Sequence, residues 1–255
     1  MNFISRTWNL FFEKLHSVAL RQMNFGRAAA YRTNGELYSL RQLARRWNDR
    51  NVTLFDVGAN VGEFTLEILE AFRNQRIQLY PFEPSARTAE QLKERIGNAP
   101  NVHVIPKALG DHAGTAELFF PNGGSSTLAS LYQRDLAHVN AFFNEKEQIT
   151  ITTLDLFCEE NKIDYLHLLK IDVEGHELGV LKGGRKMMER DAIEVIQFEF
   201  GGTSLDSRTF FKDFYQLLSP KYKIYRILPR GLRELVTYSE KLEIYQSANY
   251  LAIHK

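Results

Sequence analysis

Acidic side chains follow three apolar runs of this chain, and the first run is Leu54-Phe-Asp-Val-Gly-Ala-Asn-Val-Gly62. It is typical of a strand, a turn of small residues and the start of a helix. A dinucleotide-binding turn has the pattern G-x-G-x-x-G. Counted from Gly58, its second and third glycines are replaced by Asn60 and Glu63. These residues argue against a nicotinamide dinucleotide and therefore against a dehydrogenase.

The same turn suits a ligand with positive charge. Asp56 and Glu63 would repel a pyrophosphate at short range and attract an ammonium or a sulfonium group. Gly58 and Gly62 permit a close backbone approach, and Asn60 is the non-glycine residue that best tolerates positive φ. S-adenosylmethionine (SAM) is a common cofactor with this charge pattern. The turn therefore predicts a SAM site.

A second acid, Glu83, ends the run Gln78-Leu-Tyr-Pro-Phe-Glu83 and precedes Pro84. It lies 21 residues after Gly62, about the distance at which a βαβ unit presents a carboxylate to a ribose diol. A carboxylate there can accept hydrogen bonds from both hydroxyls. We therefore expect Glu83 to bind the ribose of the cofactor, with helix capping as the alternative.

The turn Ala108-Leu-Gly-Asp111 follows the next apolar run. Asp111 could accept a hydrogen bond from an adenine amino group, or from its own backbone in an ordinary turn. In register with Asp56 and Glu83, it is expected at the adenine edge of the same pocket, together with Leu109.

The third acidic stretch is Leu168-Leu-Lys170-Ile-Asp172-Val-Glu174-Gly-His176-Glu177. Strand alternation places Lys170 and Asp172 on the same face, at the carboxyl edge where ligands bind. His176 follows at this edge, and a neutral imidazole near pH 7 could deprotonate a hydroxyl. Glu199 ends the next apolar run and is a rival acid or base. The catalytic candidates are therefore Asp172, His176 and Glu199.

A metal ion is the alternative way to activate a hydroxyl. Asp172 and Glu199 carry hard oxygen ligands on adjacent predicted strand ends, and Mg²⁺ bound there would polarise the hydroxyl. Two acids are a small ligand set, so no metal site is assigned.

Composition narrows the class of protein. The formal net charge of +1 gives no reason to expect a nucleic acid partner, and no apolar run approaches the length of a membrane span. The single cysteine, Cys158, excludes an internal disulfide and fits a reducing compartment. We therefore expect a cytoplasmic protein.

Alternating apolar and amphipathic segments predict an α/β fold with a mostly parallel sheet. The expected strands are 52–57, 77–82, 102–105, 166–171 and 193–198, with an antiparallel pair at 222–228 and 243–253 closing the sheet edge. The expected helices are 62–73, 85–97, 176–190 and 206–218. An insert at 114–153 holds two β-like runs, 115–120 and 149–153, with a helix between them and a mobile loop at 122–127 that could cover the acceptor.

The first 51 residues form a separate segment before the α/β domain of residues 52–255. Residues 3–23 have apolar positions at helical spacing. Their polar face has few lysines or arginines, which favours packing on the same domain or on a sister subunit over a membrane surface. The pair Asn34-Gly35 predicts a short hairpin between 31–33 and 36–38, with Ser39 capping a helix that ends near Asn51.

These motifs together resemble the FkbM family of SAM-dependent methyltransferases, over roughly residues 52–201. The matching segments are Phe55–Gly62, Phe82–Pro84, Ala108–Asp111, Gly124–Leu128, Thr153–Asp155, Lys170–Glu177 and Leu181–Gly184. The resemblance implies the Rossmann-like class I methyltransferase fold and methyl transfer to oxygen, often to a hydroxyl of a sugar or of a polyketide-like product.

The resemblance also implies roles for individual residues. Asp56, Gly58, Asn60 and Gly62 would line the methionine end of SAM, with Asp172 facing its reactive end. Glu83 would hold the ribose, and Leu109 to Asp111 the adenine. Transfer to nitrogen or carbon, and SAM binding without turnover, remain alternatives. The acceptor is expected to be a glycan or a small molecule, with a homo-oligomer through the N-terminal helix as an option.

Overall fold

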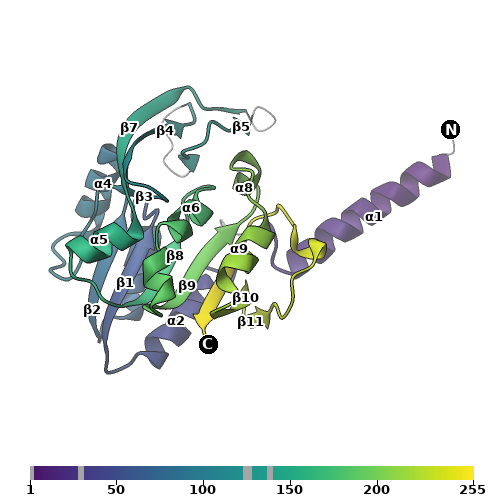
Figure 1. Cartoon of the computed structure of the whole chain (residues 1–255). Coiled ribbons are helices and arrows are strands. Elements are labelled where there is room, and N and C mark those ends of the chain that lie inside the picture. Colours follow the sequence, from purple (N-terminus) through teal and green to yellow (C-terminus); the bar gives the residue numbers. More distant parts are fainter. Residues whose placement is uncertain (1–2, 28–31, 123–127, 137–139) are drawn as a thin grey trace.

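Seven strands form the central sheet, in the order β11-β10-β12-β9-β8-β1-β2 (Figure 1). The computed structural model describes residues 3–27, 32–122, 128–136 and 140–255. The strands of this sheet are β1 (Asn51–Val57), β2 (Arg76–Phe82), β8 (Leu166–Ile171), β9 (Ile193–Phe200), β10 (Tyr222–Leu228), β11 (Gly231–Glu234) and β12 (Ala248–His254). The helices are α1 (Phe3–Gln22), α2 (Glu36–Arg46), α3 (Glu63–Ala71), α4 (Ala86–Ile96), α5 (Leu154–Glu160), α6 (Glu177–Lys182), α7 (Arg185–Glu189), α8 (Thr203–Asp206) and α9 (Phe211–Leu218).

The strand directions confirm the expected mostly parallel sheet. β2, β1, β8 and β9 are parallel neighbours, whereas β12 pairs antiparallel with both β9 and β10. The antiparallel C-terminal pair is therefore confirmed, but it does not close the sheet, because β11 adds a further edge strand beside β10. This is the Rossmann-like arrangement of class I methyltransferases.

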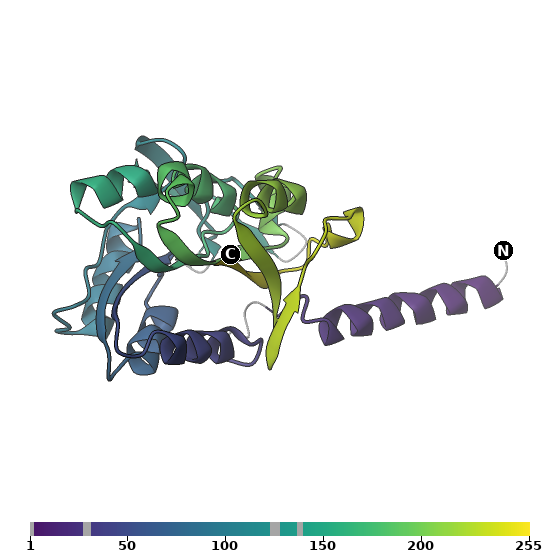
Figure 2. The ribbon, with the colours of Figure 1, turned by 60° about the horizontal axis from the view of Figure 1, so that its bottom comes forward.

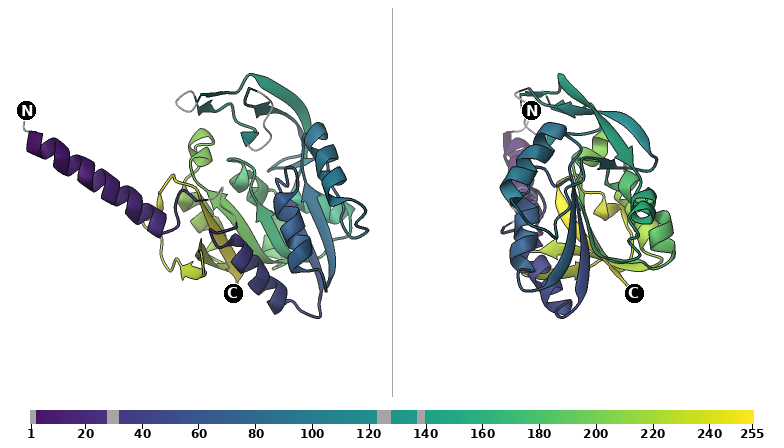
Figure 3. Two further views of the ribbon diagram at one scale, coloured as in Figure 1. Left: turned by 180° about the vertical axis from the view of Figure 1, so that it is seen from behind. Right: turned by 90° about the vertical axis from the view of Figure 1, so that its left-hand side faces the viewer.

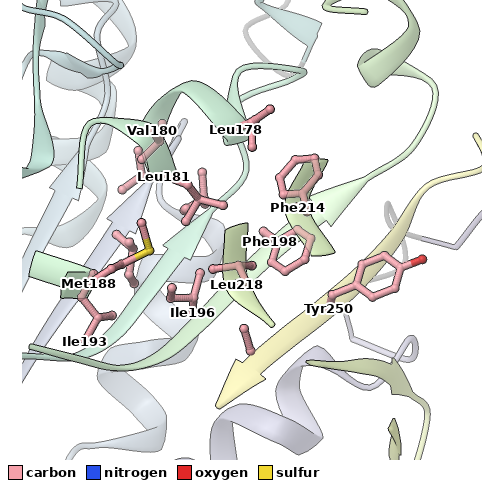
Figure 4. Close-up of a cluster of buried hydrophobic side chains, with 14 of the residues drawn as sticks. Leu178, Val180, Leu181, Met188, Ile193, Ile196, Phe198, Phe214, Leu218 and Tyr250 are labelled. Atoms are coloured by element: carbon pink, nitrogen blue, oxygen red, sulfur yellow. The ribbon is translucent and has the colours of Figure 1, made fainter. Parts of the chain in front are cut away.

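Helices cover both faces of the sheet, which explains why β8 and β9 are buried almost throughout (Figures 2 and 3). On one face, Leu40 of α2 and Ile68 of α3 belong to a buried cluster with the sheet. On the other face, Leu181 of α6 and Phe214 of α9 lie against Phe198 of β9 (Figure 4). The two apolar layers hold the sheet rigid beneath its carboxyl edge.

A smaller sheet stands beyond the carboxyl edge of the main one (Figure 1). Its strands are β3 (Ala108–Leu109), β4 (Gly114–Phe120) and β7 (Glu145–Thr152), in the order β3-β7-β4. Two short strands, β5 (Asp135–Leu136) and β6 (Ala141–Phe142), form a separate pair. These strands confirm the β-like runs of the insert. The prediction of a helix between them is wrong, because residues 121–122, 128–136 and 140–144 contain no α-helix. The predicted loop at 122–127 lies outside the described residues, apart from Asn122.

Three other expected elements differ in the structure. The run 102–105 pairs with β2 through isolated bridges, Leu79 to Val102 and Phe82 to Ile105, and forms no continuous strand. The helix expected at 176–190 is two helices, α6 and α7. A side chain on Gly183 would lie 2.0 Å from the carbonyl oxygen of Gly110, so the chain must pass this point without one. In the same way, the run 206–218 divides into the end of α8 and α9.

The predicted hairpin around Asn34-Gly35 is wrong. Residues 36–38 begin α2, while residues 28–31 lie outside the described part of the chain. Asn34 Oδ1 accepts a hydrogen bond from the Glu36 backbone N–H at 2.9 Å, and Gly35 has a φ of 104°. The Asn-Gly pair therefore supplies a helix start, as an Asx turn, instead of a hairpin turn. Ser39 lies inside the helix.

Helix α1 confirms the helical pattern of residues 3–23 but projects away from the domain (Figures 1 and 2). Residues 8–19 are exposed, and burial begins at Leu20 and Phe25. The expectation that this apolar face packs on its own domain is therefore wrong. None of the helices in the described residues combines the length and the apolar character needed to cross a bilayer.

Candidate active site

A cavity of about 880 Å³ opens where the carboxyl ends of the parallel strands meet the smaller sheet. Its lining residues come from several separate parts of the chain. The lining includes Gly26, Glu36, Gly58, Asn60, Glu63, Glu83, Lys107, Leu109, Arg134, Lys170, Asp172, Glu174, His176 and Glu199. Ligand pockets commonly measure about 300–1,000 Å³. The cavity is therefore large enough for a nucleoside cofactor and part of an acceptor.

One side of the cavity, called here the turn side, is made by the turn after β1 and the end of β2. Gly58 has a φ of 81°, and a side chain there would lie 1.8 Å from the carbonyl oxygen of Asp172. Asn60 follows with a φ of 49°, in the left-handed region. The ends of β1 and β8 thus touch through backbone, as the small residues of the turn predict.

Glu83 fixes this turn through its carboxylate. Its Oε2 accepts the backbone N–H of Asn60 and its Oε1 that of Ser85, both at 3.0 Å. Burial raises the pKa of Glu83 to about 7, although these two hydrogen bonds act in the opposite direction. A carboxylate has about four acceptor positions, so Glu83 retains capacity for ligand hydroxyls while it aligns the loop.

Asp56 lies beneath the cavity and does not line it. It is completely buried, Thr65 Oγ1 donates to its Oδ2 at 2.7 Å, and the ammonium of Lys170 is 3.2 Å from its Oδ1. Burial alone would lower the pKa of Lys170, but Asp56 and Asp172 outweigh it and raise that pKa. The expectation that Asp56 offers free negative charge to a cationic ligand is therefore wrong, because Lys170 neutralises it.

Two other predicted cofactor residues also lie off the cavity wall. Gly62 precedes α3 with a φ of 85°, and a side chain there would meet Leu92 of α4 at 2.4 Å. It therefore serves the packing of α3 on α4. Asp111 is exposed and lies 2.6 Å from Nδ1 of His112. Leu109 does line the cavity and is buried beneath it.

His176 lines the cavity with its ring held in place. Tyr132, from the insert, has its hydroxyl 3.0 Å from Nδ1 of His176. On the other side, side chains on Gly110 or Gly179 would lie 3.1 Å and 2.4 Å from Nε2. Burial lowers the pKa of His176, which keeps the imidazole neutral at neutral pH. Two glycines and a tyrosine therefore define the orientation of this candidate base.

The opposite side of the cavity, called here the acid side, carries Glu36, Lys170, Asp172, Glu174 and Glu199. Its cation, Lys170, lies 3.6 Å from Asp172, as strand alternation predicted. The carboxylate of Glu199 accepts no hydrogen bond and forms no ion pair within the described part of the chain. Burial and the neighbouring carboxylates raise the pKa of Glu199. Glu199 is thus the acid whose oxygens remain available to a ligand.

Glu36 is a cavity residue that the sequence did not reveal. It is buried at the start of α2, and Asn34 and Asn249 each donate a hydrogen bond to its Oε1, while Gln197 donates to its Oε2. Burial raises its pKa to about 7. Its three amide donors come from separate parts of the chain, so no local motif marks it. Gln197 is the sole indirect signal, because it shares a face of β9 with Glu199.

Arg134 and Glu174 join the insert to the main sheet across the cavity. Arg134 contacts Oε2 of Glu174 through Nη1 and Oδ2 of Asp206 through Nε, both at 3.1 Å. Ser130 adds a hydrogen bond to the Glu174 carbonyl at 2.7 Å. Burial raises the pKa of Glu174 to about 8, with Arg134 opposing that shift. The sequence run around Glu174 predicted an acid here but not its partner from the insert.

The charges of the lining favour a cationic ligand. Six carboxylates line the cavity, from Glu36, Glu63, Glu83, Asp172, Glu174 and Glu199, against three cations, Lys107, Arg134 and Lys170. Glu177 is not part of the lining, and its carboxylate accepts the backbone N–H groups of Val173 and Gly175. No group of three or more metal-ligating side chains occurs among the described residues. An organic cation such as a sulfonium or an ammonium fits this lining.

Comparison with known proteins identifies relatives of this chain. A family model described as "Methyltransferase FkbM domain" matches residues 56–227. The 2-O-methyltransferase NoeI of Sinorhizobium fredii is 22% identical over 201 residues, covering 75% of this chain and 81% of the relative. The hexuronic acid methyltransferase AglP of Haloferax volcanii is 27% identical over 169 residues, covering 66% of this chain and 64% of the relative.

Solved structures include a methyltransferase FkbM from Methylobacillus flagellatus KT, 17% identical with a TM-score of 0.47. That comparison covers 79% of this chain and 43% of the other. A SAM-dependent methyltransferase from Agrobacterium tumefaciens is 10% identical with a TM-score of 0.48, covering 86% and 61%. The strand order of this chain by itself shows the Rossmann-like fold.

Proposed function

We propose that this chain, which belongs to the FkbM family of methyltransferases, transfers a methyl group from SAM to a hydroxyl oxygen of a sugar. The observation that carries the proposal is the cavity itself, in which six carboxylates surround a space next to a nucleoside-type turn. The names of the two curated relatives, one a 2-O-methyltransferase and one acting on a hexuronic acid, support oxygen and a sugar as the acceptor.

In this proposal the turn side holds the cofactor. The backbone of Gly58 and Asn60 permits close approach, Glu83 accepts hydrogen bonds from the ribose hydroxyls, and Leu109 packs beneath the adenine. Asp172 faces the cationic methionine end. Bound there, SAM supplies an electrophilic methyl group next to a positively charged sulfur. Asp56 and Gly62 act indirectly, through Lys170 and through the packing of α3.

The acid side then positions and deprotonates the acceptor. We assign the general base to Glu199, because it is the catalytic candidate whose carboxylate has no partner among the described residues. A raised pKa makes it a stronger base, and a cation bound nearby favours its ionised form. Asp172 is partly neutralised by Lys170, and His176 is hydrogen-bonded to Tyr132. These two would orient the acceptor and remain the alternative bases.

A Mg²⁺ ion bound by Asp172 and Glu199 is the alternative means of activating the hydroxyl. Lys170 already provides positive charge 3.6 Å from Asp172, which disfavours a divalent cation at the same carboxylate. The proposal therefore predicts that dialysis against EDTA leaves turnover unchanged, and that added Mg²⁺ does not raise it. A loss of turnover that Mg²⁺ restores would replace the Glu199 base with a metal.

The cellular setting is also part of the proposal. Cys158 is buried and is the single cysteine of the chain, which fits a reducing compartment such as the cytoplasm. The formal net charge of +1 supports a glycan or small-molecule acceptor over a nucleic acid.

The experiment that tests the function uses SAM with an isotopically labelled methyl group. The protein is incubated with a panel of saccharides that includes hexuronic acids, and the products are identified by mass. A methyl ether on a hydroxyl survives mild alkali, whereas a methyl ester on a uronic carboxyl is hydrolysed. Alkali-stable label on a sugar is expected. Label on nitrogen or carbon, or tight SAM binding without any transfer, would contradict the proposal.

A further inference from the structure

The apolar face of α1 has no partner within its own domain. Trp8, Phe11, Phe12, Leu15 and Val18 are each 50–58% exposed, although they follow one another at helical spacing. The rings of Trp8 and Phe11 meet edge to face with centroids 6.0 Å apart, and those of Trp8 and Phe12 stack at 6.1 Å. An uncovered aromatic face of this kind marks an interaction site.

The helix is firmly connected to the rim of the cavity. Leu20 and Phe25 are buried, and the side-chain amide of Asn24 donates to the carbonyls of Asn34 and Ile227. Gly26, which follows directly, donates its N–H to the Ser247 carbonyl at 2.9 Å and lines the cavity. The free part of α1 therefore begins next to the lining of the cavity.

The breadth of the face fits a planar apolar phase better than a single partner helix. Trp8, Phe11, Leu15 and Val18 follow the 3-4-3 spacing of a coiled-coil seam, but Phe12 and Ala19 widen it on one side. Such a face, broader than a two-helix seam and led by a tryptophan, suits the boundary between lipid headgroups and acyl chains.

The basic residues of α1 are few, but two of them lie next to this face, which opposes a second copy and suits an anionic surface. Lys14 and Arg21 lie at the seam-flanking positions on one side, whereas the single acid of α1, Glu13, lies at an outward position. In a parallel pair these cations would face Phe12 and Ala19 positions, and in an antiparallel pair they would face each other. Neither arrangement brings an acid to a cation.

The charge of the N-terminal segment differs in sign from that of the remainder. Residues 1–27 contain four arginines and lysines against one glutamate, a formal charge of +3, while the whole chain carries +1. The remaining 228 residues therefore carry −2. Basic residues near a membrane surface are attracted to anionic lipids by about 1 kcal/mol each.

From the exposed aromatic face, its breadth and its basic flank, we propose that α1 is a membrane-surface anchor that lies in the headgroup region of an anionic bilayer. The bound helix brings the rim of the cavity to the bilayer. This anchoring does not depend on the proposed methyl transfer, because the binding elements lie outside the cavity.

The test measures flotation of the full chain with vesicles of phosphatidylcholine alone and of phosphatidylcholine with phosphatidylglycerol, without SAM or acceptor. Binding is expected with the anionic vesicles. The triple variant W8S/F11S/F12S should lose about 100-fold or more of the partition coefficient, and K14E/R21E at least about tenfold. As a matched control, L205S/V236S removes two exposed apolar side chains elsewhere (58% and 76% exposed) and should bind as the parent does.

Tryptophan fluorescence locates the contact. The chain has two tryptophans, exposed Trp8 and fully buried Trp47, so a blue shift on vesicles reports Trp8 and should disappear in Trp8→Phe, which should still bind. Absence of vesicle binding overturns the proposal, as does binding that the α1 variants leave unchanged. A lipid-free dimer by light scattering, abolished by W8S/F11S/F12S and unable to bind vesicles, would overturn it in favour of a second copy.

Discussion

The two sides of the cavity differ in the parts of the chain that form them. The turn side is mainly backbone, and its geometry follows from residues that are neighbours in the sequence, such as Gly58 and Asn60. The acid side consists of side chains from α2, β8, β9 and the loop before α6, with Arg134 added by the insert. We therefore expect substitutions that change the shape of the backbone to disrupt the turn side. Substitutions that change a charge should disrupt the acid side.

The largest effect is expected on the turn side. Gly58→Ala would place a methyl group 1.8 Å from the Asp172 carbonyl oxygen at a φ of 81°. We expect a loss of about 3–5 kcal/mol in the free energy of unfolding, from left-handed strain and overpacking together. Urea denaturation measures it. Gly97→Ala is the control without a close contact, since Gly97 has a φ of 67° and a ψ of −153° but nothing within 4 Å of an added Cβ, and backbone strain alone should cost about 1–3 kcal/mol. Equal losses in both variants would show that contact with β8 is unimportant.

The next effect belongs to the acid side. Glu199→Gln keeps the shape of the side chain but cannot take the proton of the acceptor, so kcat should fall by about 100-fold or more. The unfolding free energy should not fall, because the buried charge is removed. Asp172→Asn and His176→Ala are measured in parallel to rank the three candidates. If Glu199→Gln retained near-parent turnover while either of the others lost it, the base assignment would pass to that residue.

A smaller effect should separate cofactor binding from chemistry. Glu83→Gln retains one acceptor oxygen but loses the second, so the Kd for SAM should rise about tenfold, as titration calorimetry would measure. Glu63→Gln removes a carboxylate that also lines the cavity but is 55% exposed, and should change the Kd by less than about twofold. A similar change in both would show that charge alone, without hydrogen bonding, governs affinity at the turn side.

The smallest effect is a pH dependence of the cavity charge. Burial raises the pKa of Glu36 and Glu83 to about 7 and of Glu174 to about 8, above the ordinary value of 4.5. The folded state therefore binds more protons than the unfolded state between about pH 4.5 and 8, and these groups stabilise it less as the pH rises through that range. Ionisation of these carboxyl groups over the same pH range strengthens the binding of a cation.

The Kd for SAM should accordingly fall several-fold from pH 6 to 8. S-adenosylhomocysteine, which lacks the sulfonium charge, should show a weaker trend. Parallel titrations of both ligands measure the difference. Identical pH profiles for the two would show that the sulfonium does not face these carboxylates.

Features that depend on adjacent residues could be predicted from the sequence. The βαβ pattern, the turn at Gly58 and the acid at Glu83 each follow from residues within one strand–turn–helix unit. The same local reasoning assigned free charge to Asp56, because its partner Lys170 lies 114 positions later and becomes a neighbour through strand pairing alone. Local pattern cannot reveal such a pairing without the strand order.

Errors in secondary structure have the same origin. Gly183 interrupts the predicted helix because it packs against Gly110, a contact between distant residues. The Asn-Gly pair was read as a hairpin because Asn34 favours both a tight turn and a helix start, and its hydrogen bonds with α2 decide between them. Glu36 itself was missed because its donors, Gln197 and Asn249, belong to β9 and β12.

The amide cradle of Glu36 has a consequence for where the autonomous folding unit begins. Similarity to the family starts at residue 56, but a protein shortened to that boundary would lose most of β1 and the lining residues Gly26 and Glu36. The buried side-chain amides of Gln197 and Asn249 would then lose the carboxylate that accepts their hydrogen bonds. The segment from Asn24 to Arg50 is thus part of the folded domain. Truncated variants should keep this segment and remove α1 alone.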